Sequence, residues 1–226
     1  MESLFKVMEA WKLAFPGAHA GVLVMKEVVN PASHAGLDRR KTDLMEEIRS
    51  RYGGLGRSQL KMISHLQVYD AYYKRFKKTF HIQLQLESIA FNGKSIPSVS
   101  ALVEAMFMAE IKDILLTSGH DLDALQLPIR LDVTKGDETY TLMRGQPQQV
   151  KRGDMIISDG TGIISNIIYG PDQRTQIQPR TCNVLYTTYA PVGIRAQAVM
   201  EHLQHIREYV RLFAPDAHTE MLQVFE

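Results

Sequence analysis

The stretch LLTSGHDLDALQLPIRLDV, residues 115–133, decides the fold, because the spacing of apolar residues changes inside it. Before it, apolar side chains recur every four positions, which predicts a helix over about 98–115. After Pro128 the apolar runs are short and rich in β-branched residues, which predicts strands. The polar part, SGHDLDAL at 118–125, therefore joins helix to sheet. It is a polar turn, the edge of an active site, or a metal site.

Strand-like runs fill the second half of the chain. They are LPIRLDV, ETYTLM, DMIIS, GIISNIIY and CNVLYTTY. Asp159 and Gly160, between the third and fourth runs, are typical of a hairpin turn. These runs predict an antiparallel or mixed sheet, built mainly after Leu127 and packed against the helix over 98–115.

The first half is mostly helical in pattern. AGVLVMKEVV at 20–29 predicts a buried strand, followed by helices over 38–52, capped by Asp38, and over 59–78. A closing amphipathic helix is expected within 193–213. The pattern is that of an α+β fold in which helices flank the sheet.

Composition sets limits on the class of protein. The chain has 226 residues, of which 45% are hydrophobic, so one domain over 1–226 with a substantial core is expected. Lys and Arg number 26 against 25 Asp and Glu, so any contact with RNA must come from a local patch. The single Cys182 excludes an intrachain disulfide and a multi-cysteine zinc site, and the first fifteen residues lack a continuous apolar run. We expect a cytoplasmic protein without membrane contact.

Motifs for cofactor chemistry are missing from the sequence. His120, Asp121 and Asp123 carry metal-ligand atoms, but no HExxH helix, cysteine pair or calcium loop accompanies them. There is no GxSxG elbow, phosphate loop or dinucleotide fingerprint. We therefore expect no metal and no cofactor. From spacing alone, Asp121 or Asp123 is expected to cap a short helical turn.

Five motifs occur in one order between Ile96 and Pro191. The matching residues are Pro97, Val103 and Glu104; DLDAL at 121–125; Ile129, Arg130, Gly136 and Glu138; Ile157 and Asp159; and Thr181, Asn183, Val184 and Leu185. This order resembles the B3/B4 domain of the phenylalanyl-tRNA synthetase beta subunit and its free-standing relatives. FPGAHAGVLVMKEVVN also resembles their opening strand, so the resemblance covers about residues 16–191.

The resemblance implies a B3/B4-like fold and an editing activity. The chain would hydrolyse, in trans, the ester of a mischarged aminoacyl-tRNA, using a positioned water and no metal. The catalytic residues that it implies are Ser118, His120 and Asp121. The substrate-binding residues are Glu104, Gly119, Arg130, Asn166, Thr181, Asn183 and Tyr186. We expect Ser118, His120 and Asp121 to face the ester, whereas Asp123 ties down the local backbone.

The chain departs from the family pattern at several positions. Ser118 stands where the synthetases have histidine, Met106-Phe107 stand where they have Thr-Asn, and Tyr186 falls near a family glutamate that recognises substrate. His120 is expected to replace the lost imidazole. The amino acid that is edited therefore does not follow from the resemblance.

Other interpretations of the candidate residues remain open. Glu104 is equally explained as a solvated helix glutamate, and Arg130 as a residue that pairs across the sheet. Asn166 is equally explained as a buried amide whose hydrogen bonds are satisfied. The residues predicted to contact RNA are Lys74, Arg75, Lys77 and Lys78, and a solvated helix end explains them equally. Two alternative functions also stay open: a non-catalytic tRNA- or RNA-binding module, and a small-molecule hydrolase or amino-acid-binding protein that reuses the pocket.

Overall fold

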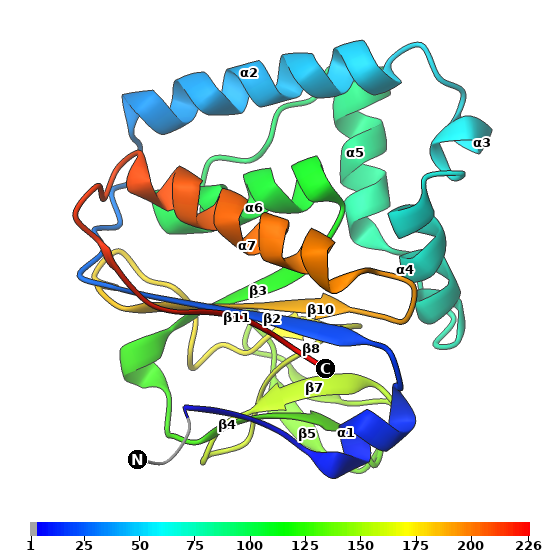
Figure 1. The fold of residues 1–226 in the computed structure, drawn as a ribbon, viewed down its shortest axis with the longest axis vertical. Coiled ribbons are helices and arrows are strands. Elements are labelled where there is room, and N and C mark those ends of the chain that lie inside the picture. Colours follow the sequence, from blue (N-terminus) through cyan, green and yellow to red (C-terminus); the bar gives the residue numbers. More distant parts are fainter. Residues whose placement is uncertain (1–3) are drawn as a thin grey trace.

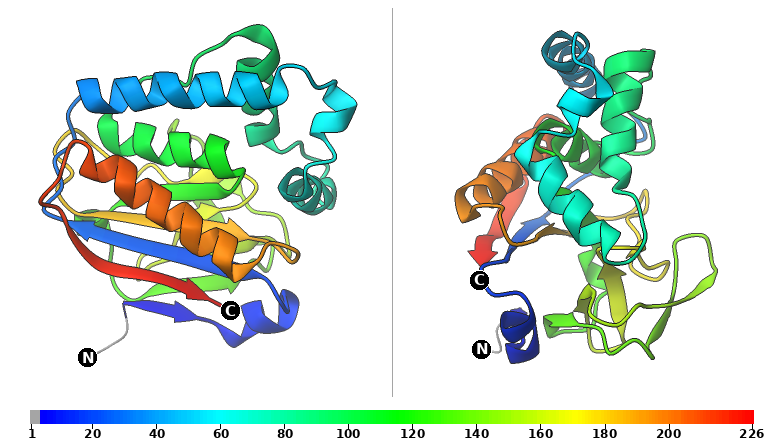
Figure 2. Two further views of the ribbon diagram at one scale, coloured as in Figure 1. Left: turned by 45° about the horizontal axis from the view of Figure 1, so that its top comes forward. Right: turned by 90° about the vertical axis from the view of Figure 1, so that its right-hand side faces the viewer.

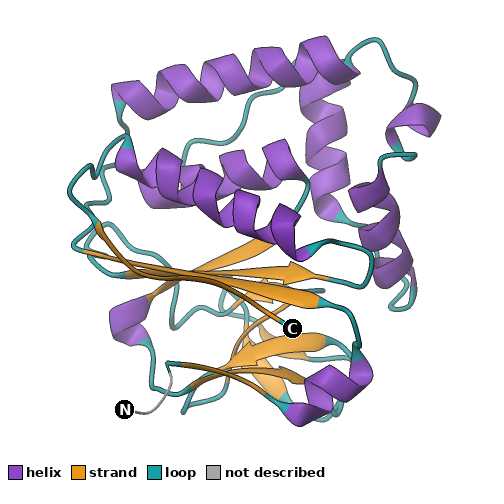
Figure 3. Cartoon of the chain, viewed as in Figure 1, coloured by secondary structure: helices purple, strands orange, loops and turns teal. Residues whose placement is uncertain are grey.

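Three layers make up the protein in a computed structural model that describes residues 4–226 (Figure 1). A layer of helices covers one face of a four-stranded sheet, and a five-stranded sheet lies against the other face. Figure 3 shows the helices gathered on one side of the two sheets, apart from the short helix Glu9–Ala14 and the 3-10 turn Leu122–Ala124. One continuous hydrophobic core joins the layers.

The four-stranded sheet is antiparallel and has the order β11-β2-β10-β3. Its strands are β2 (His19–Lys26), β3 (Leu116–Asp121), β10 (Val184–Ala190) and β11 (His218–Phe225). Both faces of β2 and β10 are covered, which explains why their sequences are almost continuously apolar. β3 is an edge strand and carries the SGHD residues that the sequence singles out.

The five-stranded sheet has the order β1-β4-β7-β8-β9, and only its β1–β4 pair is parallel among the described residues. Its strands are β1 (Phe5–Val7), β4 (Ile129–Val133), β7 (Met155–Ser158), β8 (Ile163–Asn166) and β9 (Gly170–Pro171). A separate hairpin pairs β5 (Thr139–Thr141) with β6 (Pro147–Gln149). Asp159 and Gly160 lie in the turn between β7 and β8, as the hairpin signal predicts.

The helices are α1 (Glu9–Ala14), α2 (Ala35–Tyr52), α3 (Arg57–Leu60), α4 (Ser64–Lys74), α5 (His81–Asn92), α6 (Ala101–Asp113) and α7 (Ala196–Arg211), with a 3-10 turn at Leu122–Ala124. α6 and α7 lie directly on the four-stranded sheet, and α2 and α5 pack outside α6 (Figures 1 and 2). α7 approaches β2 closely at Gly21, where an added Cβ would lie 2.7 Å from Val199. The missing side chain therefore lets this helix sit against the sheet.

The α+β prediction is confirmed, but the sheet prediction is wrong in one respect. Two sheets form, and α6 packs against the one that includes β2 and β3, both of which precede Leu127. The change of periodicity near Pro128 marks the passage from one sheet to the other.

Several helix boundaries also differ from the predictions. The helix expected over 59–78 is broken, because Ile63 adopts an extended conformation and the chain starts α4 at Ser64. Asp38 lies in the first turn of α2, whose N-cap position is His34. Val99 lies outside α6 and is 57% exposed. The elements that were not predicted are α1, α5, β1, β3, β6, β9 and β11; β3 takes the place of the polar turn expected at 118–121.

Candidate functional site

A cavity of about 650 Å³ lies beside the edge strand β3. α6 supplies one wall, and segments around β8 and β9 supply another. The lining residues are His81, Val99, Val103, Met106, Phe107, Glu110, Leu116, Thr117, Ser118, Gly119, Met143, Asn166, Ile167, Ile168, Tyr169, Gly170, Pro171, Gln176, Ile177 and Tyr189. The wall is largely apolar with a few polar groups, which is the usual make-up of a small-molecule site.

Three residues expected at a site line this cavity together: Ser118, Gly119 and Asn166. Ser118 and Gly119 belong to β3, and Asn166 ends β8 in the facing sheet. The two strands are far apart in sequence, and the stacking of one sheet on the other brings them to one wall. Of the stretch SGHDLDAL, the first two residues therefore form part of a cavity wall and the other six do not.

His120 does not line the cavity, contrary to the expectation that it faces the ester. It is 0% exposed because its side chain points between the sheets, where Nε2 lies 3.0 Å from Ser118 Oγ and Nδ1 lies 2.7 Å from Thr175 Oγ1. Burial lowers the pKa of His120 to about 3, with smaller opposing effects of Asp159 and Arg174. A neutral imidazole in this position orients the Ser118 hydroxyl.

Ser118 belongs to a network of hydroxyl groups. Its Oγ lies 2.8 Å from Thr187 Oγ1 and donates to Ser165 Oγ at 3.1 Å. Behind His120, the Thr175 hydroxyl donates to the carboxylate of Asp172. Such a buried network holds Ser118 in one orientation.

Gly119 presents backbone to the cavity. Thr117 N donates to Glu110 Oε1 and Asp121 N donates to Thr175 O, each at 2.7 Å and each away from β10. Backbone groups alternate in direction along an antiparallel strand, so the N–H of Gly119 also points away from β10. A Cβ on Gly119 would lie 2.8 Å from Ile177 Cδ1, so glycine keeps this approach open.

Two polar side chains complete the wall. Glu110 was not predicted, although it lies three positions after Phe107 on the face of α6 that lines the cavity. Burial raises the pKa of Glu110 to about 8, against the opposing hydrogen bond from Thr117 N. Asn166 Oδ1 accepts from Tyr169 N at 2.7 Å, while its buried Nδ2 has no hydrogen-bond partner within residues 4–226. Asn166 therefore lines the cavity, but its unpaired Nδ2 is buried among the surrounding side chains and is not exposed to the cavity space.

Asp121 caps the short turn, as the spacing allows, and neither aspartate of SGHDLDAL faces the cavity, contrary to the expectation for Asp121. Asp121 Oδ1 accepts from Asp123 N at 3.0 Å and caps the 3-10 turn, and its Oδ2 accepts from Thr181 Oγ1 at 2.7 Å. Asp123 is exposed and accepts from Asn183 Nδ2 through both carboxylate oxygens. None of Asp121, Thr181 and Asn183 lines the cavity: Asp121 is the last residue of β3, and Thr181 and Asn183 lie in the loop before β10.

The remaining substrate-binding candidates also lie outside the cavity lining. Glu104 is 2% exposed and forms an ion pair with Lys41 Nζ at 2.6 Å, so it is neither a solvated glutamate nor a cavity acid. Tyr186 donates its hydroxyl to Leu102 O at 2.8 Å beneath α6. Arg130 is half-buried on β4, with NH1 3.5 Å from Asp159 O.

The four basic residues predicted to contact RNA are exposed at the end of α4 and in the following loop. Lys74 pairs with Asp70 at 2.6 Å, and Arg75 lies over the ring of Tyr72 at 5.2 Å. Lys78 Nζ lies 5.3 Å from the ring of Tyr169, which lines the cavity. The far end of the basic segment therefore lies beside the cavity.

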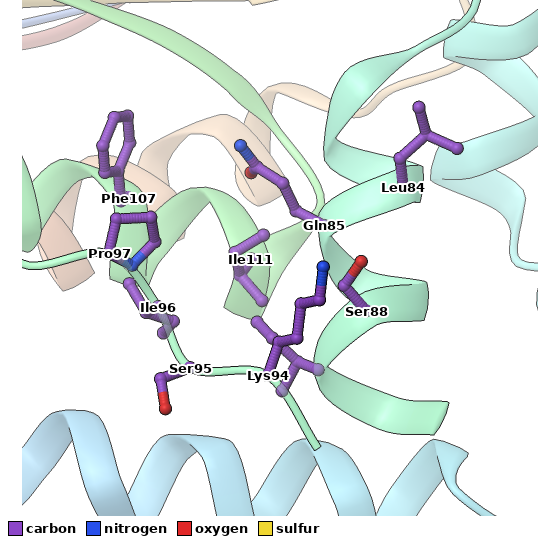
Figure 4. A pocket seen from close by; sticks show the side chains of 10 residues that line it. Leu84, Gln85, Ser88, Lys94, Ser95, Ile96, Pro97, Phe107 and Ile111 are labelled. Atoms are coloured by element: carbon purple, nitrogen blue, oxygen red, sulfur yellow. The ribbon is translucent and has the colours of Figure 1, made fainter. Parts of the chain in front are cut away.

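A smaller cavity of about 260 Å³ shares Phe107 of α6 with the first (Figure 4). It lies between α5, the segment 94–97 and α6, and Figure 4 shows Lys94 and Ser88 among its mostly apolar side chains. Within residues 4–226, no cluster of three or more His, Cys, Asp or Glu side chains is arranged to hold a metal ion. Over the same residues, no helix combines the length and apolar character needed to cross a membrane.

Comparison with known proteins gives a fold-level likeness and no family. No protein-family model and no curated protein sequence matches the chain. One similar solved structure is an N-terminal fragment of the phenylalanyl-tRNA synthetase beta-subunit from Pyrococcus horikoshii, with a TM-score of 0.48 and 10% sequence identity. The match covers 94% of this chain and 49% of that one, so the chain spans about half the length of the fragment.

Proposed function

We propose that the chain hydrolyses the ester of mischarged aminoacyl-tRNA in trans, with the aminoacyl group bound in the 650 Å³ cavity. The observation that carries this proposal is the convergence of Ser118, Gly119, Asn166 and Glu110 on one wall of an otherwise apolar cavity. The order of motifs shared with the synthetase editing domain supports the choice of substrate.

The polar wall suits the chemistry of ester hydrolysis. As water attacks the carbonyl carbon, negative charge develops on the carbonyl oxygen and must be stabilised by hydrogen-bond donors. The N–H of Gly119 is one such donor, and the unpaired Nδ2 of Asn166 becomes a second when this side chain turns toward the bound ester. Ser118, held by His120, orients the attacking water.

Glu110 supports the same chemistry through its proton. A group with a pKa near the working pH transfers protons most effectively, and the pKa of Glu110 is raised by burial to about 8. In its protonated form it donates a proton to the leaving ribose oxygen, and the resulting carboxylate then recovers one from water. No metal enters this scheme, so independence from chelators remains a prediction.

The basic segment supports tRNA as the carrier of the ester. Lys77 and Lys78 are exposed, and Lys78 lies near a cavity residue, Tyr169. Positive charge beside the opening would attract the phosphates of an acceptor end. Arg211 is exposed at the C-terminal end of α7, which lies on the other side of the molecule from α4 in Figure 1, and is a matched control for charge.

A panel of mischarged tRNAs incubated with the purified chain tests the proposal. We expect release of at least one amino acid, slowed about 10²-fold or more by Asn166→Ala through loss of a transition-state donor. Ser50→Ala, an exposed change on α2, should leave the rate unchanged. Salt-sensitive tRNA binding without release would support a binding module instead. Amino-acid binding without tRNA affinity would support a small-molecule protein.

A further inference from the structure

A second chain of hydrogen bonds reaches the cavity from the helix side of β3. Thr117, a lining residue, has its Oγ1 2.7 Å from His202 Nε2. The other nitrogen of that ring, Nδ1, lies 2.8 Å from Asp113 Oδ2. The three residues come from β3, α7 and α6, so a hydroxyl, an imidazole and a carboxylate are aligned in the order found in acyl-transfer triads.

The hydrogen bonds fix the direction of the Thr117 proton. Burial alone would raise the pKa of Asp113, but hydrogen bonds from His202 and His205 hold it well below its usual range, so this carboxylate is ionised. An ionised carboxylate only accepts, so His202 Nδ1 carries the proton and a neutral ring accepts at Nε2. Thr117 then donates to His202, and Thr188 Oγ1, 3.1 Å away, donates to Thr117.

The two imidazoles beside the cavity differ as bases. His120, behind Ser118, contacts Thr175 and has no carboxylate of its own. His202 contacts Asp113 directly, and that negative charge stabilises the imidazolium that forms when the ring takes a proton. Of the serine and threonine hydroxyls in the lining, that of Thr117 therefore has the better base.

The Thr117–His202–Asp113 array reaches the cavity at Thr117, beside a hydrogen-bond donor. Thr117 and Gly119 both lie on the face of β3 that α6 covers, and both line the cavity. The outward N–H of Gly119 is two residues along the same strand. We propose that Thr117 is an acyl-accepting nucleophile, with His202 as its base and Asp113 positioning that base. The proposal rests on the proposed function only for the identity of the natural acyl donor.

This route replaces the direct attack of water on the ester, and it proceeds in two balanced steps. Thr117 Oγ1 attacks the ester carbonyl while its proton passes to His202 Nε2. The carbon–oxygen bond to the alcohol then breaks, and the alcohol leaves with that proton. Water next attacks the acyl-threonine, giving its proton to His202, and Thr117 departs and recovers the proton as the free acid forms. No oxidant or further reactant is needed.

An activated ester tests the array without tRNA. With p-nitrophenyl acetate, we expect a burst of p-nitrophenolate and, after acid quenching, one acetyl group on Thr117 by peptide mass mapping. Thr117→Val, which keeps the shape but removes the hydroxyl, should abolish labelling. His202→Gln should slow labelling about 10²-fold or more. Thr42→Val, the same change at an exposed position of α2, should retain it.

The outcomes separate this inference from the proposed function. No acetylation of folded wild-type protein, or acetylation at Ser118, would overturn the role of Thr117. If Thr117→Val fails to fold, Thr117→Ser keeps the test open, because it should be acetylated at the same position. Mischarged-tRNA hydrolysis that persists at full rate in Thr117→Val would overturn the nucleophile and leave the proposed function standing. Acetylation of Thr117 without tRNA hydrolysis would support the nucleophile and overturn the proposed function.

Discussion

Glu110 offers a quantitative test of the cavity wall, through its replacement by glutamine. The carboxyl group is 3% exposed, and one of its oxygens accepts from Thr117 N at 2.7 Å. Burial raises its pKa from an ordinary value of 4.5 to about 8. Glutamine keeps the shape and the acceptor but does not ionise. Glu110→Gln should therefore remove the pH-dependent contribution of this side chain to the free energy of unfolding.

The sign and size follow from the two pKa values of Glu110. Between about 4.5 and 8 the folded chain holds a proton that the unfolded chain has lost, so the free energy of unfolding falls as pH rises. Each pH unit in this window is worth up to about 1.4 kcal/mol. The free energy of unfolding of the wild type should be lower than that of Glu110→Gln by about 3 kcal/mol at pH 7 and by about 5 kcal/mol at pH 9. Below pH 4.5 the difference should vanish.

Urea unfolding of both proteins between pH 5 and pH 9 measures this difference. We expect the two stability curves to separate steadily as pH rises, with the glutamine variant the more stable. Glu46→Gln, an exposed change on α2, should follow the wild type throughout. Parallel curves for Glu110→Gln and wild type would refute the reasoning, because the carboxyl would then ionise in the folded chain as readily as in the unfolded one.

Three further predictions concern other parts of the molecule. Glu104→Ala should lower the free energy of unfolding by about 3 kcal/mol in urea titrations, because it removes the buried carboxylate and leaves the Lys41 ammonium only Asp38 at 3.2 Å and Ser98 Oγ at 2.9 Å. Adding Lys41→Met should recover much of that loss. Asp121→Ala should cost about 0.5–2 kcal/mol, more than Asp123→Ala, because Asp121 is the cap; thermal melts compare the two. Lys78→Ala should weaken tRNA binding and reduce the slope of log affinity against log salt by about 1.

The elements predicted from sequence were those with strong local patterns. β2, β7, β8 and β10 are buried on at least one face, and their apolar runs predict them. β9 has two residues, too few to show a pattern, and β11 is a half-exposed edge strand. The division into two sheets also escaped prediction, because it depends on pairings between segments distant in the chain.

The site shows the same division between local and distant information. Asn166 stood out as a polar residue within an apolar run, and Ser118 and Gly119 as polar and small residues after a helix. The contact of His202 with Asp113 joins residues 89 positions apart, and no spacing in the sequence indicates it. His120 looked available for chemistry because sequence alone does not tell which face of an edge strand it occupies.

The pairing of β11 with β2 has a consequence for how the chain reaches its folded state. Residues 20–26 of β2 pair with residues 218–225 of β11, and nearly the whole chain lies between the two strands. The sheet around β2 is therefore complete only when the last residues of the chain have joined it. During synthesis the backbone groups along one edge of the apolar β2 remain unpaired until β11 has been made. An unpaired apolar strand edge favours association with other chains. Contacts of such long separation also slow folding. Shortening the chain before His218 should therefore produce a species that aggregates, even though the cavity lies at the other edge of the sheet.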